Sequence, residues 1–275
     1  SQKDIIVAGD MDLDIRNNKL SNAEGKARIT DLHITLNQDE TFSMDELEIE
    51  SKFTGPDTKI LKVDSDVIQA LVTGRFEIDQ LPGIFLEHIS RNHTGFAQRL
   101  NIKPPKRSPA PARFNFEIEV KDSKGFNHLL SSKLFPLRDL HMSGGYNELS
   151  DELAINVSTP VFQFGNLKLE NIYLRWDAES GAALFEAGVD ATVLNGKTLL
   201  STPVILQGSV YKDSLLFGLT YVSEGMKVLD KIQLDGTLAA VDSNAFSLHF
   251  EQSNLTLMNR LWLINPDNKL VFSQN

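Results

Sequence analysis

Alternation of apolar and polar residues with a period of two is the feature that most limits the fold of this chain. The run 114–120 alternates Phe, Phe, Ile and Val with polar residues, and the runs 153–157, 215–221 and 246–250 repeat the pattern. Successive side chains of a strand point to opposite faces, so each run has one apolar and one polar face. Fully buried parallel strands would be apolar on both faces. The pattern therefore predicts antiparallel strands with one wet face.

Short turn signals separate these runs. Examples are Gly55-Pro56-Asp57, Ser180-Gly181, Asn195-Gly196 and Lys212-Asp213. Strands separated by such turns indicate a meander of hairpins, and roughly fifteen to eighteen strands fit the template. We therefore expect an all-β fold with minor helix, in which an antiparallel meander sheet curls into a half-pipe (a β-taco) or an open sandwich.

Two segments depart from the strand pattern. Apolar residues recur at spacings of three and four over residues 80–91, which predicts an amphipathic helix capped by Asp79, with a further turn over 96–100. A second short helix is expected over residues 123–134 for the same reason. In the first helix the following residues should fall on one face: Leu81, Ile84, Phe85, His88 and Ile89.

Proline dominates the segment between the two expected helices. Four prolines fall between Pro104 and Pro111, which excludes regular structure and favours an extended linker. We expect residues 102–112 to join a β-meander that ends in a helix, 1–101, to a second β-meander or half-pipe, 113–275, which contains the helix at 123–134.

Glycines recur inside the alternating runs, at Gly74, Gly144, Gly208 and Gly236. A glycine within a strand marks a bend, a bulge or a close approach of another group to the backbone. Their repetition predicts a sheet that curls at regular intervals.

Catalytic and metal-binding patterns are absent from the sequence. Cysteine is missing, and the six histidines form no HxH or HxxxH pair. The motifs GxSxG, GxxxxGK[ST] and GxGxxG do not occur. A formal net charge of −10 disfavours binding to a phosphate backbone. We expect a protein that is not an enzyme, with no catalytic residues, no cofactor, no metal and no nucleic-acid partner.

The apolar strand face remains as the candidate site. It forms either a closed sandwich core or an open groove, and periodicity does not separate the two because both need one apolar face. A groove would hold lipid or an unfolded protein client against these residues: Val72, Phe76, Ile78, Phe114, Phe116, Ile118, Val120, Ile155, Val157, Phe185, Val189, Leu206, Val210, Phe217, Leu219, Phe246, Leu248 and Phe250.

Several runs resemble TamB-like proteins of the Bacteroidetes type, within the AsmA/TamB-like envelope family. The run 60–78 followed by Leu81-Pro82 is similar to the strand pair, glycine turn and short helix of that family. The similarity continues through 114–120 and Gly144, and it closes with the strand 246–250 and the segment 261–264. The resemblance spans most of the chain, which we interpret as a segment of a longer protein.

The resemblance implies a place and partners. Such a protein is anchored in the inner membrane, lies in the periplasm and reaches an Omp85-type outer-membrane β-barrel. The implied role is outer-membrane biogenesis through an apolar β-groove, either by transport of phospholipid acyl chains or by assembly and translocation of outer-membrane proteins. The anchor itself is not in this sequence, so membrane contact would involve parts of the full-length protein that are missing here.

Two other hypotheses belong to different classes. A structural or adhesin-like surface protein would close its apolar faces into sandwich cores and would have no lipid groove. A carbohydrate-binding module would need exposed aromatic side chains, whereas the chain has two Trp and four Tyr. Whether the apolar faces close on one another is the observation that separates the first hypothesis from the second.

Overall fold

A computed structural model of the chain describes residues 5–17, 23–36, 40–99, 102, 110–122, 138–223, 229–242 and 245–273. Within these residues the chain forms one sheet of nineteen strands, together with the helices α1 (Leu81–Asn92) and α2 (Thr94–Arg99). The strands are β1 (Ile5–Arg16), β2 (Glu24–Leu36), β3 (Glu40–Phe53), β4 (Lys59–Ser65), β5 (Ile68–Arg75), β6 (Arg113–Asp122), β7 (Arg138–Asn147), β8 (Glu152–Phe164), β9 (Leu167–Glu179), β10 (Ala182–Val189), β11 (Ala191–Leu194), β12 (Lys197–Leu200), β13 (Val204–Tyr211), β14 (Ser214–Val222), β15 (Leu229–Asp242), β16 (Ala245–Phe250), β17 (Ser253–Leu257), β18 (Arg260–Ile264) and β19 (Lys269–Ser273).

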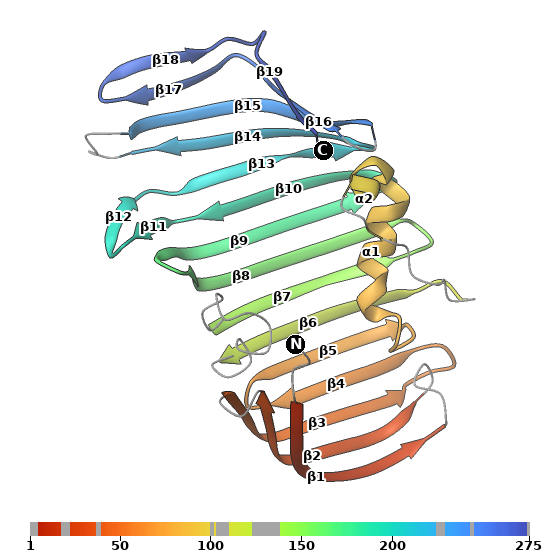
Figure 1. Cartoon of the computed structure of the whole chain (residues 1–275). Coiled ribbons are helices and arrows are strands. Elements are labelled where there is room, and N and C mark those ends of the chain that lie inside the picture. Colours follow the sequence, from red (N-terminus) through yellow and green to blue (C-terminus); the bar gives the residue numbers. More distant parts are fainter. Residues whose placement is uncertain are drawn as a thin grey trace.

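The sheet is a long antiparallel meander that stays open (Figure 1). Strands from β1 to β10 pair in sequence order, and β13, β14 and β15 continue the sheet from β10. Two long strands each pair with two shorter strands along one edge. β9 pairs with β10 and then with β11, and β15 pairs with β16 and then with β17. These breaks raise the strand number above the expected range. The predicted all-β meander with minor helix is confirmed.

Hairpin turns form where the sequence predicted them. Ser180 and Gly181 both have positive φ, as do Asn195 and Gly196. Positive φ at both central residues is the geometry of a two-residue hairpin turn whose twist matches that of the flanking strands.

The sheet runs without a break across the predicted linker. β5 pairs with β6 along its whole length, with Val72 opposite Phe116. The two segments that the sequence predicted, 1–101 and 113–275, therefore contribute to one sheet. Residues 103–109 of the linker and the helix expected over 123–134 lie outside the described residues.

Helices α1 and α2 form a strap, residues 81–99, that runs across the strands close to one of the two ends of those strands (Figure 1). The predicted helix and the further turn are both present. The predicted cap is wrong, because Gln80 is the N-cap residue and no side chain makes a capping hydrogen bond. A proline in the first turn suits a helix start, since its missing N–H would lack an intrahelical partner there anyway.

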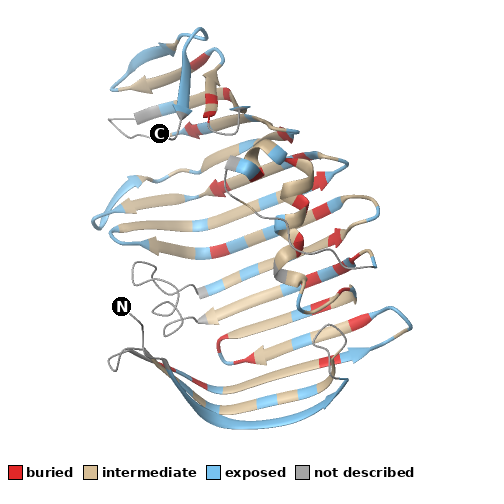
Figure 2. Cartoon of the chain, turned by 45° about the vertical axis from the view of Figure 1, so that its right-hand side comes forward, coloured by how far each residue is buried: buried red, intermediate tan, exposed pale blue. Residues whose placement is uncertain are grey.

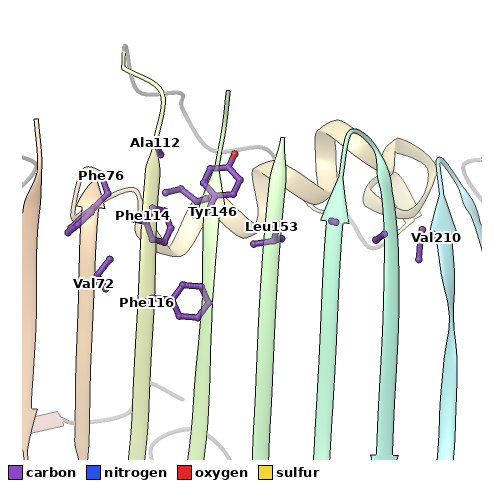
Figure 3. Packing of buried hydrophobic residues seen from close by; sticks show 11 residues of the cluster. Val72, Phe76, Ala112, Phe114, Phe116, Tyr146, Leu153 and Val210 are labelled. Carbon is purple, nitrogen blue, oxygen red and sulfur yellow. The ribbon is translucent and has the colours of Figure 1, made fainter. Parts of the chain in front are cut away.

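The main core lies between the strap and the sheet. Ile84 of α1 is 5% exposed, and the Phe85 ring meets the Phe116 ring edge-on at a centroid distance of 5.7 Å. Many of the buried residues follow the line where the strap crosses the strands (Figure 2). Figure 3 shows the aromatic and aliphatic side chains that this crossing covers: Val72, Phe76, Ala112, Phe114, Phe116, Tyr146, Leu153 and Val210.

Candidate functional site

The sheet has an inner face, which we define as the face that carries the strap, and an outer face. Phe114 and Phe116 face the strap, and the strand register carries this orientation from one strand to the next. On β1 the same face ends in Met11, Leu13 and Ile15. The inner face is therefore apolar from the first strand onward.

Directly beneath the strap lies a cross-strand row of buried residues, which we call the covered row. Its members pair in succession from β6 to β13, and each is at most 4% exposed: Phe114, Tyr146, Leu153, Ala178, Ala183 and Val210. The strap therefore buries this row almost completely.

The next row away from the strap combines aromatic residues with glycines. Phe116 is paired with Gly144, Phe185 with Gly208, and Phe217 with Gly236. A methyl group on these glycines would lie 2.8 Å from Phe116 Cζ, 3.0 Å from Phe185 Cε1 and 2.8 Å from Phe217 Cζ respectively. Each ring thus lies over the glycine of a neighbouring strand. The predicted close approach is confirmed for these three glycines and for Gly74, where an added Cβ would overlap the Arg113 carbonyl oxygen and where φ is +146°.

One row further lies an aliphatic row, which crosses the sheet from β1 to β15. Every member is Ala, Val, Leu, Ile or Met, and each is paired with the next: Leu13, Ala27, Ile49, Val63, Ala70, Ile118, Met142, Val157, Leu174, Ala187, Leu206, Leu219 and Leu234. Leu13 is exposed and the other side chains are partly buried, with Ile118 and Met142 packed against the buried cluster. The strap lies over the covered row, and no described segment lies over the aliphatic row in the same way.

The outer face carries most of the charged residues along the same strands, although Leu71, Leu184 and Leu216 are exposed on it. Asp10, Asp12 and Asp14 are exposed on β1, as the wet-face prediction requires. Further along, a hollow of about 760 Å³ is lined by residues that include Arg175, Glu186 and Gln207, and Arg175 lies 3.4 Å from Glu186. Since its charges have both signs and lie in the open, this hollow is a weaker candidate site than the aliphatic row.

Nearly all of the predicted groove residues share the inner face. Phe76 and Ile78 differ, because β5 ends at Arg75 and both residues lie in the segment that connects β5 to the strap. The residues that the register places on the inner face are Val72, Phe114, Phe116, Ile118, Val120, Ile155, Val157, Phe185, Val189, Leu206, Val210, Phe217, Leu219, Phe246, Leu248 and Phe250.

Burial divides this predicted set. Val72, Phe114, Phe116 and Val210 are buried in the cluster beneath the strap. Ile118, Val157, Leu206 and Leu219 belong to the open aliphatic row. Periodicity identifies the face of each residue but carries no signal for the position of the strap.

Polar contacts attach the strap to the turn between β7 and β8. Arg91 forms an ion pair with Asp151, and Asn92 Nδ2 donates a hydrogen bond to Asp151 Oδ1 at 3.1 Å. Arg91 also donates to the Tyr146 hydroxyl at 3.4 Å. One carboxylate therefore holds the C-terminal end of α1.

A second attachment joins the strap to the turn between β13 and β14. His93 Nδ1 lies 2.7 Å from the carbonyl oxygen of Lys212, and it donates the hydrogen bond because a carbonyl only accepts. The Gly95 N–H donates to Asp213 Oδ1 at 2.6 Å. Beyond this turn, the ring of Phe96 stacks on that of Phe246 at 5.4 Å. Sequence reasoning identified Lys212-Asp213 only as a turn, since nothing local in the sequence marks a partner so far along the chain.

His88 is buried inside the first attachment. It is 1% exposed, and burial lowers its pKa from 6.5 to about 4. Its Nδ1 atom lies 3.3 Å from Asn92 Nδ2 and 3.4 Å from Asp151 Oδ1. The imidazole is neutral at neutral pH, and within the described residues the buried Nε2 has no hydrogen-bond partner.

The described ranges contain neither a candidate metal site nor a helix that could cross a membrane. There, no three or more His, Asp and Glu side chains gather as ligands for a metal ion. Neither α1 nor α2 has the length and apolar character that a helix needs to cross a membrane. Comparison of the chain with protein-family models, curated protein sequences and solved structures finds no match.

Proposed function

We propose that the inner face of this sheet binds the acyl chains of phospholipids, and that the chain is a lipid-carrying segment of an envelope protein. The aliphatic row is the observation that carries the proposal. It is apolar without interruption from Leu13 to Leu234, and its side chains are exposed or only partly buried. A long uncovered apolar surface on a folded chain is typical of a binding site.

The dimensions of the row suit an acyl chain. Neighbouring strands lie about 4.8 Å apart, so the eight steps from Ala70 on β5 to Leu234 on β15 span about 38 Å. The acyl chains of one membrane leaflet cover about 15 Å, which is half of a hydrocarbon core of roughly 30 Å. Burial of each CH₂ group is worth about 0.8 kcal/mol, and no directional polar contact is needed. An acyl chain that crosses the strands therefore fits within the row.

The open sheet supports a groove over a closed sandwich core. At one end β1 pairs only with β2, and at the other end β18 and β19 pair only with β17 and β16. No second sheet covers the aliphatic row within the described residues. A structural or adhesin-like role with sealed cores has no comparable observation in its favour.

The resemblance to TamB-like proteins adds a setting to the proposal. In that setting the chain lies in the periplasm, between an inner-membrane anchor and an outer-membrane β-barrel, and it serves outer-membrane biogenesis. The curled, half-pipe form of the sheet belongs to the same proposal. An unfolded outer-membrane protein strand is the second candidate cargo, because alternate side chains of such a strand are apolar.

Site-specific photocrosslinking in cells tests the proposal. The photoreactive residue benzoylphenylalanine replaces Val157 or Leu219 on the aliphatic row, and Asn156 or Thr220 serves as the matched outer-face control. We expect phospholipid adducts at the two inner-face positions and none at the controls. Adducts to a polypeptide at these positions would mean that the inner face binds a protein client and not lipid. The absence of any inner-face adduct would refute the groove.

A further inference from the structure

The strap occupies the same apolar surface that is open on the aliphatic row. Strands β6 to β10 carry the covered row beneath the strap and, further along, the aliphatic row. The two rows are four residues apart on each strand, which corresponds to about 13 Å. Leu81, Ile84, Phe85 and Phe96 of the strap pack on the covered face. These side chains fill the place that an acyl chain would take if the face were open along its whole width.

The seam between strap and sheet contains polar atoms that lack partners. Five buried atoms make no hydrogen bond within the described residues: His88 Nε2, Ser90 Oγ, His93 Nε2, Asn147 Oδ1 and Ser150 Oγ. The first three belong to the strap, Ser150 lies in the turn between β7 and β8, and Asn147 lies on the outer face at the end of β7. A buried polar group without a partner destabilises the docked state by about 1–3 kcal/mol. The seam therefore weakens the attachment that the apolar contacts provide.

The polar contacts that do form are concentrated at two carboxylates. Asp151 holds Arg91 and Asn92, and Asp213 holds the backbone of Gly95. Both carboxylates lie on turns at the strap end of the strands rather than in the sheet itself. An attachment through two points, with an apolar contact between them, can open as a unit when a competing apolar ligand is present.

We propose that the strap is a displaceable cover of the lipid-binding face. Incoming acyl chains compete with Ile84 and Phe85 for the covered row, so loading beyond the aliphatic row requires the strap to leave its docked position. This inference rests on the proposed function, since it names the regulation of the same face.

An engineered disulfide tests the cover directly, because the chain contains no other cysteine. A Cβ atom on Gly95 would lie 2.9 Å from Cβ of Ala240 on β15, and a disulfide needs about 3.8 Å between such atoms. The same atom would lie 2.8 Å from Cγ of Asp213, so Gly95→Cys with Ala240→Cys should oxidise after the backbone shifts by under about 1 Å and the Asp213 side chain moves aside. Vesicles of phosphatidylethanolamine and phosphatidylglycerol in equal parts, with a fluorescent phosphatidylethanolamine, supply the lipid. We expect the oxidised protein to bind less lipid at saturation than the same protein after reduction, because only the aliphatic row then stays open.

A release variant gives the opposite prediction. Asp213→Ala removes the acceptor of the Gly95 N–H, a contact to a charged group worth about a tenfold change in equilibrium. We expect it to take up lipid faster than the parent, with the circular dichroism of a folded sheet retained. Asp235→Ala, in a turn-free part of β15, is the matched control and should leave uptake unchanged.

Trp176 reports the position of the strap independently of uptake. The His93 ring lies 6.4 Å from the Trp176 ring, and Trp262→Phe leaves Trp176 as the sole tryptophan. Lipid should change the emission of Trp176 in the reduced protein and not in the oxidised one. Equal uptake by the oxidised and the reduced form would overturn the displaceable cover. If no form takes up lipid, it is the proposed function that fails.

Discussion

Protonation of His88 should couple the stability of this protein to pH in a defined range. The folded protein holds the pKa of His88 at about 4, because the ring is buried beneath the strap, whereas the unfolded chain has a pKa near 6.5. Between these values the unfolded chain binds a proton and the folded protein does not. The stabilising contribution is therefore complete above a pH of about 6.5 and is lost as the pH falls towards about 4. This difference in pKa corresponds to about 3 kcal/mol.

The variant His88→Gln isolates this contribution. Glutamine does not titrate and still offers Asn92 a hydrogen-bond acceptor, so titrating groups that do not contact residue 88 affect both proteins alike. Asp151 lies 3.4 Å from the His88 ring and is the exception. Urea unfolding at a pH of about 7.5 and of about 4 gives the free energy of unfolding for each protein. We expect the parent to lose about 3 kcal/mol more than the variant between the two conditions. A difference below about 1 kcal/mol would refute the reasoning, since it would mean that water reaches the ring and that the strap is not docked as described.

Three further predictions follow from the rows and the strap. Leu206→Glu should abolish lipid binding with little change in stability, whereas Gln207→Glu on the outer face should leave binding intact, as a vesicle-binding assay would show. Gly236→Val should lower the free energy of unfolding by more than about 2 kcal/mol in urea titrations, because the Phe217 ring lies over that glycine. Asp151→Ala should reduce it by about 1–3 kcal/mol, since Arg91 and Asn92 lose their shared acceptor; an unchanged midpoint would contradict that anchor.

The strands and their faces follow from the sequence because their cause is local. A period of two fixes which side chains share a face, and it placed Ile118, Val157 and Leu219 correctly on the inner face. Turn chemistry is local as well, since Asn195-Gly196 adopts positive φ wherever the hairpin lies. The strap helix was predictable from its own periodicity for the same reason.

The position of the strap was not predictable, because its contacts join distant parts of the chain. Phe96 stacks on Phe246, and His93 contacts the backbone of Lys212, although nothing in the sequence near either pair indicates the other. Where the strap packs decides which inner-face residues are buried. Periodicity alone therefore left the choice between a sealed core and an open groove undecided.

Local backbone irregularities also escaped the sequence patterns. Asp31, Asp139 and Asn171 have positive φ inside strands, and each precedes an aliphatic residue. Asp and Asn adopt this conformation more easily than other residues with a side chain, but the same residues are equally common at turns and on wet strand faces. Their sequence therefore does not separate a kink within a strand from an ordinary exposed position.

Methyl NMR with spin-labelled phospholipid tests the central claim most directly. A nitroxide on the acyl chain broadens the signals of methyl groups that lie near it. The aliphatic row offers Val157, Leu206 and Leu219, while Leu184 and Leu216 are exposed on the outer face, at 65% and 47%, as matched controls. Binding of acyl chains to the inner face predicts broadening of the first three signals and not of the two controls. Equal broadening on both faces, or none on the aliphatic row, would contradict it.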